Sequence, residues 1–208
     1  MEPYSQRPPF YAQWGEDRWL AKTMAIPVHG VFVDVGAGDG VRGSNSLYFE
    51  NLGWTGLAID PDPRNALPLS HRRCVVHTCA IASTPGSQLF GSYIHKPSWS
   101  GLQRRGPDFD LITVDCRPLA ELLLPLAIAT IDLLSIDVEG TELDVWDSID
   151  HRSTTCRLVV VEFDDRHSER TRDVIHRHLG ADVYDLVYET PANLIFERKD
   201  SRWPRRRH

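Results

Sequence analysis

A glycine-rich turn directly after an apolar run carries the first chemical signal in this chain. The run Val31-Phe32-Val33-Asp34-Val35 contains one acid and is followed at once by Gly36-Ala37-Gly38-Asp39-Gly40. A second apolar run, residues 57–59, ends in Asp60. Glycines let a ligand approach the backbone closely, and an acid at the end of the next strand can accept the hydroxyl groups of a ribose. The pairing predicts a site for a ligand that contains adenosine.

The spacing of these glycines separates two classes of ligand. Gly36-x-Gly38-x-Gly40 differs from the GxGxxG of dinucleotide-binding enzymes, and 208 residues are few for a dehydrogenase, so an NAD-dependent oxidoreductase is disfavoured. Ser44-Asn45-Ser46 then starts a predicted helix. The Ser44 hydroxyl can cap the first amides of this helix, or those amides and Asn45 can hold a ligand carboxylate. Both interpretations stay open.

A second group of acids follows the apolar run 131–136. Asp137 comes at the carboxyl end of this predicted strand, where open α/β sheets bind their ligands. Glu139 opens the next predicted helix, and Glu142 lies one turn later. Acids in a first helical turn complement the helix dipole, which is sufficient to explain Glu142. It does not explain Asp137, which we interpret as functional.

A third strand, 158–162, ends in Glu162 and is followed by Asp164 and Asp165. If this strand neighbours the one that ends in Asp137, then Asp137, Glu162 and Asp164 converge. Such a cluster of carboxylate oxygens is suited to Mg²⁺ or another divalent cation. The alternative is that Asp164 and Asp165 cap the following helix.

An α/β fold is required to bring these strand ends together. Apolar strand-like runs alternate with helix-like stretches, which predicts a mostly parallel sheet with helices on both faces. The predicted strands are residues 31–35, 57–60, 74–77, 131–136, 158–162, 182–188 and 193–197. The predicted helices are residues 16–24, 44–51, 64–69, 118–124, 139–148 and 168–179.

Residues 84–110 differ from the rest of the chain. They are rich in Gly, Pro, Ser and aromatic residues and lack helical periodicity. We predict a strand or hairpin at 87–94 and a mobile loop at 96–107, which together form either a substrate lid or a surface insertion. The aromatic and basic side chains of this segment would suit a ring or sugar with anionic groups: Tyr93, Trp99, Phe109, Lys96, Arg104 and Arg105.

Length and composition limit the class of protein. A chain of 208 residues suits one domain, and its net charge of -6 argues against nucleic acid as a partner. No apolar run approaches the roughly 20 residues that span a bilayer. The polar segment 1–10 is predicted to be flexible and has no apolar core like that of a signal peptide, so we expect a cytoplasmic protein. The basic tail, 202–208, is predicted to be disordered.

The motifs as an ordered set resemble the FkbM-type methyltransferases. The segments that carry the resemblance are VDVGAGDG (33–40), SNS (44–46), GWTGLAIDP (53–61) and DLLSIDVEGTE (132–142). Residues 11–17 are similar to the entry segment of the family, often written SQxGED, with Ala12 in place of the serine. The resemblance implies a Rossmann-like fold with seven strands, the last antiparallel. It also implies S-adenosyl-L-methionine as cofactor and O-methylation of a small molecule, sugar or natural product.

The same resemblance implies roles for individual residues. Asp34, Gly36, Ala37 and Gly38 would line the methionine and ribose side of the cofactor; Asp60 would accept the ribose hydroxyls, and Pro61 would flank the adenine. Ala80 and Ile81, within residues 78–81, would contact the adenine edge, while Asp137 and Glu139 would face the methyl group and the acceptor.

Methyl transfer to a hydroxyl requires that the acceptor lose a proton. Asp137 is the preferred general base, acting directly or as a metal ligand. His77, His95 and His167 are weaker alternatives, because most histidines are surface residues. A non-catalytic module that keeps the nucleotide-binding fold is the main rival to an enzyme.

Overall fold

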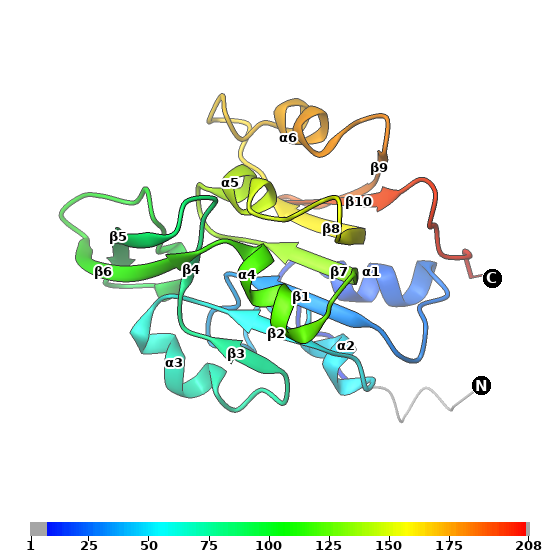
Figure 1. Ribbon diagram of the computed structural model, residues 1–208, viewed down its shortest axis with the longest axis horizontal. Coiled ribbons are helices and arrows are strands. Elements are labelled where there is room, and N and C mark those ends of the chain that lie inside the picture. Colours follow the sequence, from blue (N-terminus) through cyan, green and yellow to red (C-terminus); the bar gives the residue numbers. More distant parts are fainter. Residues whose placement is uncertain (1–7, 207–208) are drawn as a thin grey trace.

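The computed structural model describes residues 8–206. Its main sheet has seven strands in the order β3-β2-β1-β7-β8-β10-β9 (Figure 1). The strands are β1 (Val31–Val35), β2 (Thr55–Ile59), β3 (Val75–His77), β7 (Thr130–Ile136), β8 (Thr155–Glu162), β9 (Tyr184–Glu189) and β10 (Asn193–Arg198). The strands from β3 to β8 pair in parallel, whereas β10 is antiparallel to both of its neighbours. The predicted α/β class and the antiparallel last strand are therefore confirmed.

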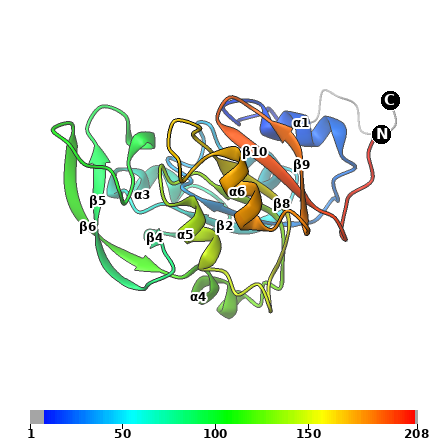
Figure 2. The same cartoon turned by 90° about the horizontal axis from the view of Figure 1, so that it is seen from above.

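The central strands are apolar along their length because helices cover both faces of the sheet. On one face, α4 (Leu119–Leu123), α5 (Glu142–Asp147) and α6 (Arg172–Leu179) pack against the sheet in the larger apolar cluster. On the other face, α1 (Glu16–Thr23) and α2 (Leu47–Asn51) contribute to a second cluster, and α3 (Pro63–Leu69) lies nearby (Figure 2). This arrangement leaves the carboxyl ends of β1, β2 and β7 side by side.

Three predicted helices begin later than expected. The helix predicted at 139–148 begins at Glu142, because Glu139 and Gly140 have positive φ angles of 60° and 140° that no α-helix accommodates. The helix predicted at 168–179 begins at Arg172, after the Thr171 cap. The helix predicted at 44–51 begins at Leu47. In each case polar residues that make hydrogen bonds at the start of the helix form the preceding turn.

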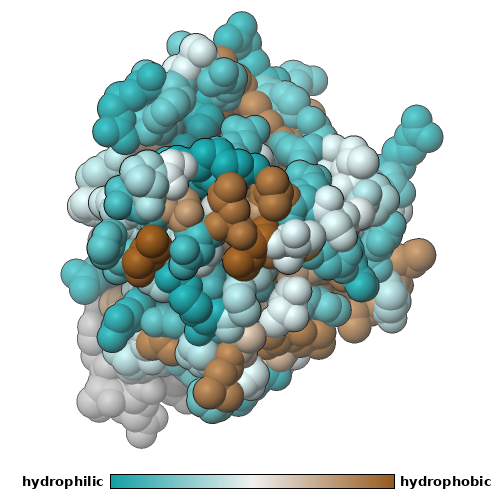
Figure 3. All heavy atoms as spheres, turned by 90° about the vertical axis from the view of Figure 1, so that its left-hand side faces the viewer, coloured by the Kyte–Doolittle hydropathy of each residue, from teal (hydrophilic) through white to brown (hydrophobic). Residues whose placement is uncertain are grey.

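Residues 84–110 contribute to a second, three-stranded sheet that projects from one end of the main sheet (Figure 1). The predicted strand is β5 (Gly86–Tyr93), which pairs along its length with β6 (Phe109–Arg117). Sequence reasoning missed both β6 and the short β4 (Ala80–Ile81), which pairs with it. Apolar side chains lie exposed at this end of the molecule (Figure 3); the hairpin and its loop contribute Leu89, Ile94, Trp99 and Leu111.

The loop between β5 and β6 has structure of its own. It contains a single turn of 3₁₀ helix, η2 (Pro97–Trp99). Gly91 and Gly101 exchange both backbone hydrogen bonds, with N···O distances of 3.0 and 3.1 Å. Residues 96–107 therefore fold back along the free edge of β5. A further 3₁₀ turn, η3 (Leu124–Leu126), follows α4.

The carboxyl-terminal segment packs on the fold, and the prediction of a disordered tail is wrong for residues 202–206. Trp203 is buried and meets the Trp54 ring edge-on, with ring centroids 5.8 Å apart. Ala25 N donates to Pro204 O at 2.7 Å, and Arg206 N donates to Thr23 O at 2.9 Å. Residues 207–208, and 1–7 of the predicted flexible N-terminus, lie outside the described residues. None of the helices within residues 8–206 is long and apolar enough to cross a membrane.

Candidate active site

A cavity lies at the carboxyl ends of β1, β2 and β7. The residues predicted to bind the cofactor all line it: Asp34, Gly36, Ala37, Gly38, Ser44, Asn45, Asp60, Pro61, Ala80 and Ile81. Asp137 lines it as well, but Glu139 does not. The parallel pairing of β1 with β2 and β7 explains this convergence, because all three strands end at the same edge.

The glycine turn bends tightly over the ends of β2 and β7. Gly36 has a φ of 85°, and a Cβ atom there would lie 1.8 Å from the Asp137 carbonyl oxygen, so only glycine fits. Gly38 has a φ of 57°, and no heavy atom lies within 4 Å of the position that a Cβ atom would occupy there. Gly36 thus permits close packing of two strand ends, whereas Gly38 faces open space in the cavity wall.

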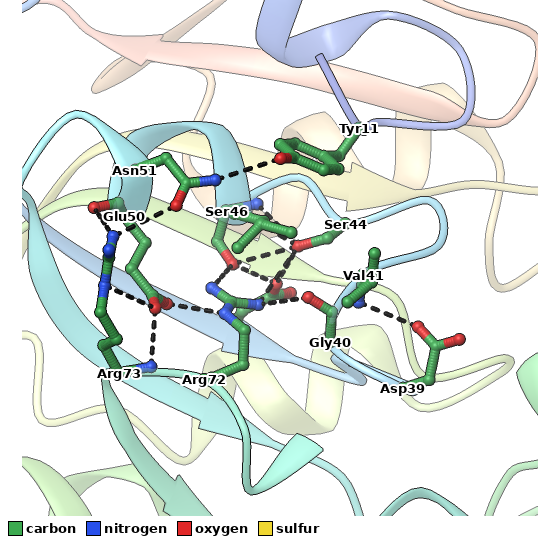
Figure 4. A network of polar contacts seen from close by, with 12 residues as sticks. Tyr11, Asp39, Gly40, Val41, Ser44, Ser46, Glu50, Asn51, Arg72 and Arg73 are labelled. Atoms are coloured by element: carbon green, nitrogen blue, oxygen red, sulfur yellow. Dashed lines mark hydrogen bonds and ion pairs between the residues drawn. The ribbon is translucent and has the colours of Figure 1, made fainter. Parts of the chain in front are cut away.

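Beneath the turn, Asp34 belongs to a buried polar network. Its carboxylate accepts a hydrogen bond from Ser46 Oγ at 2.5 Å and a longer one from Ser44 Oγ at 3.4 Å. Burial raises the pKa of Asp34, and the Arg72 guanidinium acts in the opposite direction. Arg72 also donates to Gly40 O at 2.9 Å and pairs with Glu50 at 2.6 Å (Figure 4). The network ties the glycine turn to α2.

Sequence reasoning missed Arg72 and Glu50. Both are almost fully buried, yet they lie 22 residues apart and in segments without a recognisable motif. A buried arginine requires a buried partner, but only the fold shows which acid supplies it.

Ser44 and Asn45 use their polar atoms differently. Ser44 Oγ accepts from Leu47 N at 3.1 Å and from Ser46 N at 3.3 Å, so it satisfies amides at the start of α2. Asn45 Nδ2 donates to Ser135 Oγ at 3.0 Å. Asn45 Oδ1 is buried and has no hydrogen-bond partner within residues 8–206. Asn45 is among the residues that line the cavity, and its buried Oδ1 is an acceptor without a hydrogen bond.

Asp60 connects the end of β2 to the glycine turn. Its carboxylate accepts from Gly38 N at 2.9 Å, from Asp62 N at 2.9 Å and from Asn65 Nδ2 at 3.0 Å. Burial raises the pKa of Asp60 to about 6, although these hydrogen bonds favour the charged form. The carboxylate is fixed in orientation at the cavity wall.

Asp137 lies at the end of β7 in a strongly acidic environment. Ligand atoms of Asp137, Glu139 and Glu162 all lie within 4.8 Å of one another. Burial and the neighbouring Glu139 carboxylate raise the pKa of Asp137. Two arginines partly compensate the acids, because Arg104 pairs with Glu139 and Arg170 with Glu162. Neither pairing was predicted from the sequence, since each arginine comes from a loop.

The predicted metal-ligand set needs correction. Asp137 and Glu162 converge, but Asp164 is not among the three carboxylates that do; Glu139 takes that place. Asp164 instead pairs with Arg166 at 2.8 Å and His167 at 2.9 Å, and hydrogen bonds from Arg166 hold its pKa below the usual range. Glu162 is the last residue of β8, so Asp164 lies in the following turn.

Other predicted candidates lie apart from the cavity. Within the described chain, the residues that line it include none of His77, His95 and His167. Arg104 is paired with Glu139, and Arg105 donates to the carbonyl oxygens of Leu102 and Arg104. The basic side chains of the hairpin loop are thus largely engaged within the protein. The cavity also includes residues that were not predicted: Gln13, Phe90, Ser100, Leu102 and Ser135.

A comparison with protein families accounts for this geometry. Residues 34–189 match the family model described as the methyltransferase FkbM domain. The chain belongs to the FkbM methyltransferase family. The match runs from Asp34, near the end of β1, to the end of β9 and includes every residue predicted for the site. Of the residues that line the cavity, only Gln13 precedes it. No curated protein matches the chain.

Proposed function

We propose that this FkbM-family protein is an S-adenosyl-L-methionine-dependent O-methyltransferase that acts on a hydroxyl group of a small molecule, sugar or natural product. One observation carries the proposal. In a chain of a methyltransferase family, the glycine turn, Asp60 and Asp137 surround a single cavity. That cavity combines features suited to an adenosine with a carboxylate suited to proton transfer.

Two features of the cavity fit this cofactor. The open space beside Gly38 allows a ligand to approach the backbone. The unpartnered Asn45 Oδ1 requires a donor. The Ser135 hydroxyl donates a hydrogen bond to Asp34 and accepts one from Asn45 Nδ2, which leaves Asn45 Oδ1 as an acceptor without a partner. An ammonium group such as that of methionine satisfies this atom, whereas a carboxylate would not.

The remaining residues have roles in positioning and proton transfer. Bound S-adenosylmethionine would supply an electrophilic methyl group. Asp137 would accept the proton of the acceptor hydroxyl, and its raised pKa makes it a stronger base than an ordinary aspartate. Glu139, held by Arg104, does not line the cavity; it would act through Asp137, beside whose carboxylate it lies.

A divalent cation such as Mg²⁺ is a separate part of the proposal. The convergence of Asp137, Glu139 and Glu162 supports it, since hard cations prefer carboxylate oxygens. A cation there would also relieve the repulsion among these acids. It would acidify the acceptor hydroxyl and so assist Asp137.

Calorimetric titration with S-adenosylmethionine and S-adenosylhomocysteine tests the function, with NAD as the comparison ligand. We expect both sulfur compounds to bind and NAD not to bind. Asp137→Asn should retain binding but lower methyl transfer to a panel of hydroxylated acceptors by about 10²–10⁴-fold. No binding at millimolar S-adenosylmethionine would refute the proposal. Binding without transfer to any acceptor would favour the non-catalytic module. Full activity after complete chelation would refute a role for the cation.

A further inference from the structure

Asp62 and Arg64, which come immediately after the predicted adenosine residues Asp60 and Pro61, form an ion pair with a buried carboxylate and a partly exposed guanidinium. Asp62 is 1% exposed, and its carboxylate accepts from Arg64 N at 2.9 Å and from the Arg64 guanidinium at 2.7 Å. Burial disfavours the charge on Asp62, but hydrogen bonds from Arg64 outweigh it and lower the pKa of Asp62. We call this pair the Asp62–Arg64 clamp.

The clamp holds both ends of the turn that follows β5. Ser92 Oγ donates to Asp62 at 2.9 Å, and Ser100 Oγ lies 3.5 Å from the same carboxylate. Arg64 donates to Tyr93 O at 2.8 Å. Ser100 Oγ also accepts from Tyr93 N at 2.8 Å, which closes the turn on itself. Ser92 and Ser100 are both buried, so their bonds to Asp62 are protected from water, whereas the bond from Arg64 to Tyr93 O is exposed.

Beyond this turn the same loop reaches the acidic side of the cavity. Gly101 packs against the turn after β7, because a Cβ atom there would lie 2.9 Å from Val138 O. Arg104 then pairs with Glu139. The segment 92–104 therefore runs from the Asp62–Arg64 clamp to the turn that follows Asp137. Along the way it contributes to the cavity wall Pro97, Ser98, Ser100 and Leu102.

We propose that Asp62 and Arg64 are positioning residues that hold segment 92–104 as a wall of the cofactor cavity. The inference rests on the proposed function and deepens it: neither residue lines the cavity, but the wall they fasten lies beside the adenosine end. Without the clamp, the segment loses its attachment to α3, while the pairing of Ser92 and Tyr93 with β6 and the contacts of Gly101 and Arg104 remain. Affinity for the adenosine part of the ligand then depends on an ion pair that does not itself line the cavity.

The test compares Arg64→Ala and Arg64→Lys with Arg117→Ala. Arg117 makes a similar pair with Asp115 two residues away, at 2.7 Å, but both side chains are exposed, and they lie at the opposite end of β6 from segment 92–104. Affinity for S-adenosylhomocysteine is measured by calorimetry. The rate of tryptic cleavage after Arg104 and Arg105 is measured without ligand, with the peptides identified by mass spectrometry.

We expect Arg64→Ala to weaken S-adenosylhomocysteine binding by about tenfold, as for loss of charged hydrogen bonds, and to speed cleavage in the loop. Arg64→Lys should keep part of the affinity and part of the resistance to cleavage, and Arg117→Ala should change neither quantity. Ser92→Ala, which removes one hydroxyl bond to Asp62, should shift both measurements in the same direction by less. It provides a second variant if Arg64→Ala fails to fold.

Unchanged affinity and unchanged cleavage in Arg64→Ala and Ser92→Ala would overturn the inference. Equal losses in Arg64→Ala and Arg117→Ala would also overturn it, since they would indicate general destabilisation. If the wild-type protein binds no S-adenosylhomocysteine, the proposed function fails. The cleavage rates without ligand then still decide whether the clamp holds the loop.

Discussion

At the scale of single residues, Asp60 combines burial with a fixed set of donors. Its carboxylate is 8% exposed, and the pKa of about 6 lies close to neutrality. A ribose requires the ionised form, because a carboxylate accepts hydrogen bonds from both hydroxyl groups. Under the proposed function, Asp60 is therefore the residue at which pH should act most directly on cofactor binding.

We predict that affinity for S-adenosylhomocysteine falls as the pH decreases through about 6. Protonated Asp60 loses acceptor capacity, and the loss of hydrogen bonds to a charged group corresponds to roughly 10–100-fold in affinity. Calorimetry from about pH 5 to about pH 7.5, which spans at least one unit on either side of this pKa, measures the change. Asp60→Asn should bind weakly and without this pH dependence.

The stability of the fold distinguishes this effect from acid unfolding. The pKa of Asp60 is higher in the folded protein than its ordinary value of 3.8, so the folded state binds the proton more tightly than the unfolded state does. Ionised Asp60 therefore destabilises the fold above about pH 6, and this cost disappears as the pH falls. Thermal unfolding at each pH is the control. An affinity that stays constant across the range would contradict the ribose assignment.

At the scale of elements, the turn after β1 contains two glycines with different roles, and only one of them packs against the end of β7. Gly36 packs against the Asp137 carbonyl oxygen, and Gly38 lies in the cavity wall with open space around it. Substitution by alanine separates packing from ligand binding at neighbouring positions of one turn.

Gly36→Ala should destabilise the fold by about 3 kcal/mol, because its methyl group would force two strand ends apart. Gly38→Ala should cost only about 1 kcal/mol, since a φ of 57° is allowed for alanine, but its methyl group would occupy ligand space. Urea unfolding and titration with S-adenosylhomocysteine measure the two effects. Gly15→Ala, also left-handed and without neighbours within 4 Å, is the control. Undiminished binding by Gly38→Ala would place the ligand elsewhere.

At the scale of the whole molecule, the chain end closes the apolar cluster on the α1 and α2 face. Trp203 packs among residues from β1, β7, β8 and β10. Its backbone N–H donates to Glu197 Oε1 at 3.1 Å, and Arg205 pairs with the same carboxylate at 2.5 Å. The segment is thus part of the core, on the opposite side of the sheet from α4, α5 and α6.

Trp203→Ala should lower the free energy of unfolding by about 3 kcal/mol, as for a large aromatic side chain removed from a core. Binding of S-adenosylhomocysteine by the folded protein should be unchanged, because Trp203 does not line the cavity. Arg202→Ala, which removes an exposed ion pair with Asp185, should cost less than about 1 kcal/mol. If urea unfolding gives the same negligible loss in the free energy of unfolding for both variants, residues 202–206 contribute nothing to stability.

The sequence by itself determined the seven strands of the main sheet, in their order along the chain, and the predicted cofactor residues that line the cavity, although not the whole of its lining. These features depend on local patterns: apolar runs such as 31–35 and 131–136, glycines that permit positive φ, and acids at strand ends. Strand β1 was predicted to the residue, and the other main strands to within a few residues. The family resemblance, carried by the same motifs, is confirmed over residues 34–189.

Only the tertiary structure decided which distant charges meet. Arg104 and Arg170 come from loops, and the replacement of Asp164 by Glu139 in the carboxylate cluster depends on a left-handed residue before α5. The strand β6 is mostly exposed, and its pairing with β5 and β4 is what defines it as a strand. Local patterns record which face of an element is apolar, whereas the pairing of buried charges depends on where the fold brings separate segments into contact.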